Sequence, residues 1–300
     1  MVGEEKYSLA KYSRPPTPSN KPTAIFRRWL SQYFLPASLK ISVIGLIVRQ
    51  LLALRSFADG SIFGDVKGDD PWVLALHGWA RTKNDFDKLF SIGKDGQNEL
   101  SGIALDLPGF GVSPPFSDAA GSLRYAESVS EIINGLDGKI VVVGHSFGGR
   151  VALHLPLLLP EKVAGLILTG VPLVNLARKR PKLTYRLIKS MHNRHLLGAK
   201  SMEKARQKFG SSDYANASSE MRQVLVSVLK EDYKPVMRQI KCPVELVWGT
   251  EDKVVPPDVA QAALSVFPHA NLTLKEGISH LLPLEDPEVI YNLCLQMRSK

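Results

Sequence analysis

A serine between glycines carries the strongest chemical signal in this sequence of 300 residues. The pattern G-x-S-x-G covers residues 144–148 (GHSFG), directly after the apolar run 140–143 and before a helix-like stretch. A strand, a tight turn and a helix in this order form a nucleophile elbow, here built by Gly144, His145 and Gly148 around Ser146. Such a turn leaves no room for Cβ atoms at the glycines and lifts the hydroxyl above the sheet. The pattern predicts that Ser146 is a nucleophile; a passive serine in a glycine-rich turn is the alternative.

A serine hydroxyl needs a general base, and His280 has the best position among the seven histidines. It follows the strand-like run Leu272–Leu274, within a loop at the carboxyl end of that strand. Catalytic groups of open α/β sheets gather at this edge. We therefore predict that His280 is the base, with a loop histidine bonded to backbone as the alternative.

The imidazole needs a carboxylate that fixes its tautomer and stabilises the imidazolium. Asp252 follows the apolar run Val244–Trp248 directly and is our choice, while the adjacent Glu251 is the alternative if the register differs by one residue. The chain order Ser146, Asp252, His280 excludes the trypsin-like and subtilisin-like orders.

The oxyanion of a tetrahedral intermediate needs hydrogen-bond donors that are already in place. We predict the backbone N–H groups of Phe147 and Trp79 for this role. Trp79 belongs to the loop His77-Gly78-Trp79, which follows the apolar run 73–76. We expect His77 and His145 to brace the backbone turns in which they lie.

The elements that must position these groups alternate along the chain. Strand-like runs and helical stretches alternate from residue 61, which indicates an α/β fold with a mostly parallel central sheet flanked by helices. This alternation is interrupted between residues 173 and 237, where only helical patterns occur. The predicted strands are 61–66, 71–76, 103–106, 139–143, 163–169, 244–248 and 271–274, and the predicted helices include 123–136, 183–191, 201–208, 218–229 and one after Asp286.

These patterns predict a domain organisation. Residues 1–22 form a disordered tail, 23–56 an N-terminal amphipathic helical arm, 57–172 and 238–300 the α/β core, and 173–237 an inserted helical cap. The arm contains an uninterrupted apolar run only over 41–48, whereas a spanning helix needs about 20 apolar residues. Two interpretations of the arm stay open: it packs on the core, or it lies in a membrane interface with its basic flanks.

Charge and cysteine content narrow the setting. The net charge of +9 comes from two segments, because residues 1–55 carry nine basic and two acidic residues and 173–240 carry 15 and five. This segregation suits an anionic membrane or an anionic substrate, and equally a solvated helix face. Two cysteines without a CxxC motif are compatible with a reducing, cytoplasmic location. The pair His192 and His195 lacks further metal ligands, so we predict no metal site and no nucleic-acid module.

The chain resembles the α/β-hydrolase fold superfamily. The resemblance spans roughly residues 60–300 and rests on the motifs at 77–79 (HGW), 106–113 (DLPGFGVS), 144–149 (GHSFGG), 249–252 (GTED) and 279–280 (SH). It implies a Ser-His-Asp enzyme that needs no cofactor, with a helical cap after the sixth strand. It carries nothing over to residues 1–55.

The resemblance implies hydrolysis of a carboxylic ester, or a related small-molecule acyl substrate, through an acyl-enzyme. Relatives with the same triad hydrolyse C–C bonds or amides, transfer acyl groups or act as lyases, and the sequence does not separate these. The serine at 146 argues against epoxide hydrolases and haloalkane dehalogenases, which have Asp there. A non-catalytic ligand-binding protein on the same scaffold is the alternative from another class.

Overall fold

The structure is a computed structural model, and it describes residues 54–93, 99–118, 120–176 and 212–298, with isolated positions between 177 and 211. The predicted tail 1–22, nearly all of the arm 23–56 and much of the cap 173–237 lie outside the described residues. The predicted membrane contact of these basic segments therefore stays a prediction. Within the described part of the chain, no helix combines the length and the apolar character that crossing a bilayer requires.

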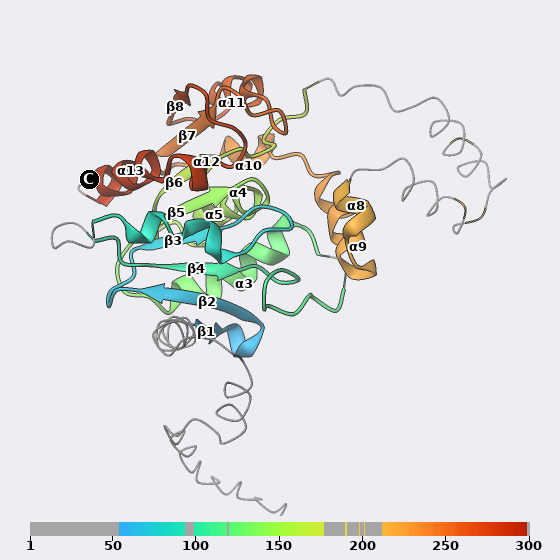
Figure 1. Cartoon of the computed structure of the whole chain (residues 1–300), viewed down its shortest axis with the longest axis horizontal. Helices are drawn as coiled ribbons and strands as arrows, with labels where there is room; N and C mark the ends of the chain where they lie inside the picture. Colours follow the sequence, from blue (N-terminus) through green and yellow to red (C-terminus); the bar gives the residue numbers. More distant parts are fainter. Residues whose placement is uncertain are drawn as a thin grey trace, which may run out of the picture. The chain divides into compact units, whose positions relative to one another are not determined.

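An eight-stranded sheet forms the centre of the fold, in the order β1-β2-β4-β3-β5-β6-β7-β8 (Figure 1). The pairs β1/β2 and β2/β4 are antiparallel, and all other neighbours are parallel. The strands are β1 Leu54–Phe57, β2 Ile62–Lys67, β3 Val73–Leu76, β4 Gly102–Asp106, β5 Ile140–His145, β6 Val163–Thr169, β7 Val244–Gly249 and β8 Ala270–Lys275. The prediction of a mostly parallel α/β sheet is confirmed.

Helices cover both faces of the sheet. In the described ranges the α-helices are α3 Ser122–Asn134, α4 Phe147–Ala152, α5 Leu155–Leu158, α8 Ser212–Asn216, α9 Ser219–Val228, α10 Lys234–Met237, α11 Pro257–Leu264, α12 Leu282–Glu285 and α13 Pro287–Arg298. The same ranges contain the short 3₁₀ helices η1 Ala58–Gly60, η2 Lys83–Phe86 and η3 Leu89–Ser91.

The core has two layers because strand side chains alternate between the faces of the sheet. In β3, Leu74 and Leu76 join one buried cluster, to which α3 and α4 contribute. Val73 and Ala75 join the other cluster, to which α13 contributes. A strand buried on both faces reads as a continuous apolar run, which is why the sequence identified these strands.

The predicted arm is wrong at its carboxyl end, because residues 54–56 belong to strand β1. This strand pairs antiparallel with β2 across a turn in which Ala58, Asp59 and Gly60 all have positive φ angles. β1 lies at the edge of the sheet, and Arg55 and Ser56 are exposed. A short edge strand therefore lacks the apolar run that marks the inner strands.

Candidate active site

Ser146 lies at a strained turn between β5 and α4. Its backbone angles φ and ψ are 50° and −110°, a conformation that residues other than glycine rarely adopt. A Cβ atom at Gly148 would lie 2.2 Å from the carbonyl oxygen of Leu76, and one at Gly144 would lie 2.6 Å from the Cα of Gly149. Glycine is therefore required on both sides of the serine, as the G-x-S-x-G pattern indicated.

The structure brings His280 and Asp252 together although 28 residues separate them. The imidazole Nδ1 lies 2.8 Å from Oδ2 of Asp252, and the aspartate side chain is only 1% exposed. A buried carboxylate at this distance favours the tautomer with its proton on Nδ1, which leaves Nε2 as the acceptor. The pair thus has the arrangement of an oriented general base.

The loop between β7 and α11 holds the carboxylate of Asp252 in place. Oδ1 accepts the backbone N–H groups of Val254 at 2.9 Å and Val255 at 2.8 Å. The buried indole N–H of Trp248 donates to the carbonyl of Val255 at 2.9 Å and closes the loop. Glu251 has a side chain that is 60% exposed and lies 3.9 Å from Lys253, so the alternative register is not the one adopted.

The imidazole of His280 lies beside the elbow. A Cβ atom at Gly170 would lie 2.8 Å from its Cε1 and 3.2 Å from Cε1 of His145. The rings of His145 and His280 are 4.9 Å apart, and the N–H of Ser146 donates to the carbonyl of Thr169 at 2.9 Å. Among the described residues no hydrogen bond joins the Ser146 hydroxyl to the imidazole. Such bonds are often long in ligand-free enzymes and shorten in the substrate complex.

His77 and His145 are neutral braces of the backbone. Burial lowers the pKa of His145 to about 3, and its Nδ1 donates to the carbonyl of Thr169 at 3.1 Å. Burial also lowers the pKa of His77, whose Nδ1 donates to the carbonyl of Gly78 at 2.7 Å while Nε2 accepts the N–H of Leu107 at 3.0 Å. Each ring therefore fixes a turn next to Ser146, as the sequence predicted.

Two backbone N–H groups near Ser146 remain available. Within the described part of the chain, no acceptor is hydrogen-bonded to the N–H of Phe147 or of Trp79. Their side chains pack edge to face at 5.5 Å, which places the two residues next to each other although 68 positions separate them. Both residues line the cavity that contains Ser146, and the oxyanion role of their N–H groups stays a prediction.

A cavity of about 510 Å³ opens over Ser146. Its walls come from the loops after β3 and β6, from α4, from α8 and α9, and from the loop that carries Asp252. Apolar side chains form most of the wall, which suits the hydrocarbon part of a small ligand. They include Pro172, Val174, Leu176, Leu225, Val228, Leu229, Val254, Val255 and Val259.

Comparison with known proteins places this geometry in a family. A sequence model described as the alpha/beta hydrolase family matches residues 73–293. The chain belongs to the alpha/beta hydrolase family. The predicted superfamily is thereby confirmed, and a hydrolase is the coarse function that the relatives support.

Three proteins illustrate what the chain is similar to. The uncharacterized hydrolase YugF of Bacillus subtilis (strain 168) is 25% identical over 242 residues, which cover 73% of this chain and 86% of YugF. A 2-hydroxy-6-oxononadienedioate/2-hydroxy-6-oxononatrienedioate hydrolase of Escherichia coli is 24% identical over 266 residues, covering 79% and 90%. The crystal structure of a bacterial membrane phospholipase A aligns with a TM-score of 0.64 at 21% identity, covering 92% and 95%, which shows a common fold.

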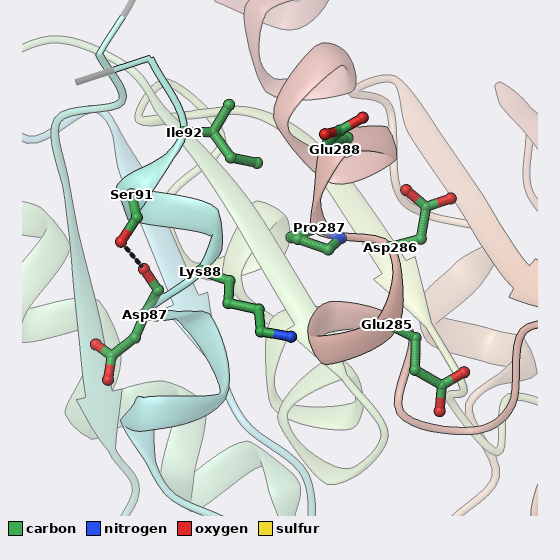
Figure 2. A pocket seen from close by; sticks show the side chains of 8 residues that line it. All are labelled: Asp87, Lys88, Ser91, Ile92, Glu285, Asp286, Pro287 and Glu288. Carbon is green, nitrogen blue, oxygen red and sulfur yellow. Dashed lines mark hydrogen bonds between the residues drawn. The ribbon is translucent and has the colours of Figure 1, made fainter. Parts of the chain in front are cut away.

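A second hollow of this hydrolase, about 560 Å³ in volume, lies away from the elbow (Figure 2). Its walls are residues 87, 88, 91 and 92, in and beside η3, and residues 285–288, from the end of α12 to the start of α13. Lys88 reaches across and donates to the carbonyl of Leu284 at 2.9 Å, and Asp286 pairs with Lys275 at 2.9 Å. No predicted site residue lines this hollow, so the cavity over Ser146 is the candidate active site.

Sequence reasoning missed Arg150, which follows Ser146 by four residues in α4. It lines the cavity and is only 7% exposed. An arginine in an otherwise small and apolar helix, GGRVA at 148–152, was the available signal. The sequence alone gave no indication of what covers it, because its neighbours Val228 and Tyr233 are more than 70 positions away.

Proposed function

We propose that this alpha/beta hydrolase cleaves carboxylic esters, or closely related acyl substrates, through an acyl-enzyme formed on Ser146. The observation that carries the proposal is the pair of His280 and the buried Asp252 beside a nucleophile elbow. A buried carboxylate bonded to Nδ1 prepares Nε2 of the imidazole for accepting a proton. A serine at a strained turn beside this imidazole is the arrangement that acyl transfer uses.

The first half of the reaction forms the acyl-enzyme. Oγ of Ser146 attacks the ester carbonyl carbon while Nε2 of His280 takes the hydroxyl proton. The N–H groups of Phe147 and Trp79 bind the oxyanion, a contribution worth about 10²- to 10³-fold in rate for each donor. The imidazolium, stabilised by Asp252, then gives its proton to the leaving alcohol as the C–O bond breaks.

The second half restores the enzyme. His280 accepts a proton from water, the hydroxide attacks the acyl carbon, and the same two N–H groups hold the second oxyanion. The bond to Oγ of Ser146 then breaks, the serine regains its proton from the imidazolium, and the carboxylic acid leaves. His280 thus acts in turn as base and acid, which requires no cofactor.

A fluorophosphonate probe tests the nucleophile directly. We expect one equivalent of label per folded chain and none on Ser146→Ala. Ser146→Ala should also lower kcat for an activated ester, such as p-nitrophenyl butyrate, by at least about 10⁴-fold. Folded protein that takes up no label and hydrolyses no ester would instead support a non-catalytic binding protein.

Hydrolysis of a C–C bond is the second candidate, because the E. coli relative bears the name of a hydrolase of 2-hydroxy-6-oxononadienedioate. The same three residues would serve: a C–C bond adjacent to a ketone breaks, and water supplies a hydroxyl group to the acyl fragment and a proton to the carbon fragment. Parallel assays with that compound and with p-nitrophenyl esters separate the two candidates. A kcat/KM that is at least tenfold higher for 2-hydroxy-6-oxononadienedioate than for the esters would favour C–C hydrolysis.

A further inference from the structure

Arg150 places a buried positive charge in the wall of the candidate active site. It is only 7% exposed and lines the same cavity as Ser146. A charge removed from water is costly unless an opposite charge or several hydrogen bonds compensate it. The groups around the guanidinium therefore indicate what this part of the cavity is built to hold.

The protein satisfies the guanidinium only in part. Nη1 donates to the carbonyl of Val228, the last residue of α9, at 2.6 Å, and the group lies 5.5 Å from the centre of the Tyr233 ring. A guanidinium has five N–H donors, and these contacts occupy one of them. Among the described residues no carboxylate forms an ion pair with Arg150.

Glu231 and Asp213 are carboxylates that do not neutralise Arg150. Glu231 accepts the N–H of Ser122 at 2.9 Å and its hydroxyl at 2.6 Å, and it also accepts the hydroxyl of Tyr233. Its oxygens are thus occupied by Ser122 and Tyr233. Asp213 lines the cavity from α8 at an exposed position and makes no ion pair with Arg150.

The unused donors of Arg150 belong to a side chain that lines the cavity. In the described part of the chain, the fully buried side-chain nitrogen and oxygen atoms without a hydrogen-bond partner are Oδ1 of Asp65 and Nε1 of Trp72. Nε and Nη2 of Arg150 have no protein acceptor and are not among these atoms, so they keep an accessible surface. Since the side chain lines the cavity, a ligand there can reach them.

The position of Arg150 fixes the shape of such a ligand. Ser146 and Arg150 are one helical turn apart, about 5.4 Å along the axis, and the arginine side chain adds its own length. The wall beside them is apolar at Leu225, Val228 and Leu229. A ligand with its carbonyl at Ser146 would thus present a hydrocarbon segment to this wall and a charged end to the guanidinium.

We propose that Arg150 determines specificity by binding a carboxylate of the substrate, so that the enzyme prefers acyl substrates carrying a second, free carboxylate. This inference rests on the proposed ester hydrolysis by Ser146. A carboxylate fits because its two oxygens match the planar guanidinium fork. One buried cation is neutralised by a monoanion, whereas a phosphate would bring more charge than the site compensates.

A matched pair of esters tests the inference on the full-length protein. One is the mono-p-nitrophenyl ester of suberic acid, which keeps a free carboxylate, and the other is the same compound with that carboxylate methylated. We expect wild type to prefer the acid in kcat/KM by about 10- to 100-fold, the range for a charged hydrogen bond. Equal rates, or a preference for the methylated ester, would overturn the inference without any variant.

Variants locate the preference. Arg150→Met should remove it by lowering kcat/KM for the acid about 10- to 100-fold and for the methylated ester less than about threefold, while Arg150→Lys should restore part of it. Arg238→Met removes an exposed arginine outside the cavity and serves as the matched control. If Arg150→Met lowers both rates equally, Arg150 is a structural clamp on Val228 and the inference fails.

A binding measurement separates this inference from the proposed function. Titration calorimetry of suberate into Ser146→Ala should show binding that Arg150→Met weakens at least tenfold. Such binding without ester hydrolysis by wild type would refute the proposed function and keep the carboxylate site. Ester hydrolysis with neither charge preference nor Arg150-dependent binding of suberate would support the proposed function and refute the carboxylate site.

Discussion

The substitution Asp252→Asn isolates the orientation of His280 from the stability of the fold. In the native loop Oδ1 accepts the N–H groups of Val254 and Val255, and Oδ2 lies 2.8 Å from Nδ1 of His280. Asparagine keeps an oxygen for the two backbone donors but turns an NH₂ group toward Nδ1. Two donors cannot face each other, so the imidazole proton must move to Nε2, which is the atom that has to accept the serine proton.

The wrong tautomer is expected to cost about 10⁴-fold in kcat, which corresponds to about 5.4 kcal/mol in the activation free energy. The free energy of unfolding should change by no more than about 1–2 kcal/mol, because the side chain keeps its volume and two of its hydrogen bonds. Ester hydrolysis under saturating substrate, together with urea denaturation, measures both quantities on the same protein.

Glu251→Gln provides the matched control, since it changes the neighbouring carboxylate, whose side chain is 60% exposed. It should leave kcat within about twofold of wild type. The reasoning would be refuted if Asp252→Asn kept more than about a tenth of the wild-type kcat, or if Glu251→Gln lost activity to a comparable degree.

Three further changes test the packing around the site. Gly148→Ala places a Cβ 2.2 Å from the carbonyl oxygen of Leu76, so we expect at least about 3 kcal/mol of destabilisation or insoluble protein, measured by urea denaturation. Because burial depresses the pKa of His145 to about 3, the unfolded chain binds its proton first; stability should fall by up to about 1.4 kcal/mol per pH unit from about pH 6.5 down to 3. His145→Asn should make that pH dependence shallower, and an unchanged slope would contradict the assignment. Ser122→Ala removes the hydroxyl that donates to Glu231 and keeps the backbone N–H, so it should lower the free energy of unfolding by about 1–3 kcal/mol in urea denaturation; a loss below about 0.5 kcal/mol would argue against a tightly coupled network.

The inner strands could be predicted because burial on both faces leaves a mark in the sequence. The run 163–169 is predicted and observed with the same bounds, since its residues are nearly all apolar and lie between two covered faces. Strand β1 could not be recognised in this way, because at the sheet edge Arg55 and Ser56 point to water. Asp59 and Gly60 in the following turn were the available signal for a hairpin.

The side chains of the candidate site also differ in how far the sequence predicts their positions. Ser146 lies in a local motif, and the strand ends predict where Asp252 and His280 meet, because parallel strands bring their carboxyl ends to one edge. Arg150 differs, since an arginine within a helix ordinarily faces solvent. Its burial depends on α9 and Tyr233, which pack against it only after the chain has folded.

The loop that holds Asp252 contains a short segment with two roles. The main-chain amides of Val254 and Val255 hold the carboxylate, while the side chains of the same residues form part of the cavity wall. Side-chain replacements there can reshape the ligand space and leave the amides untouched. Proline at either position would delete one of these amides and so tie any change of ligand preference to a loss of proton-transfer efficiency. Laboratory evolution of new substrate preference should therefore accept many residue types at 254 and reject proline.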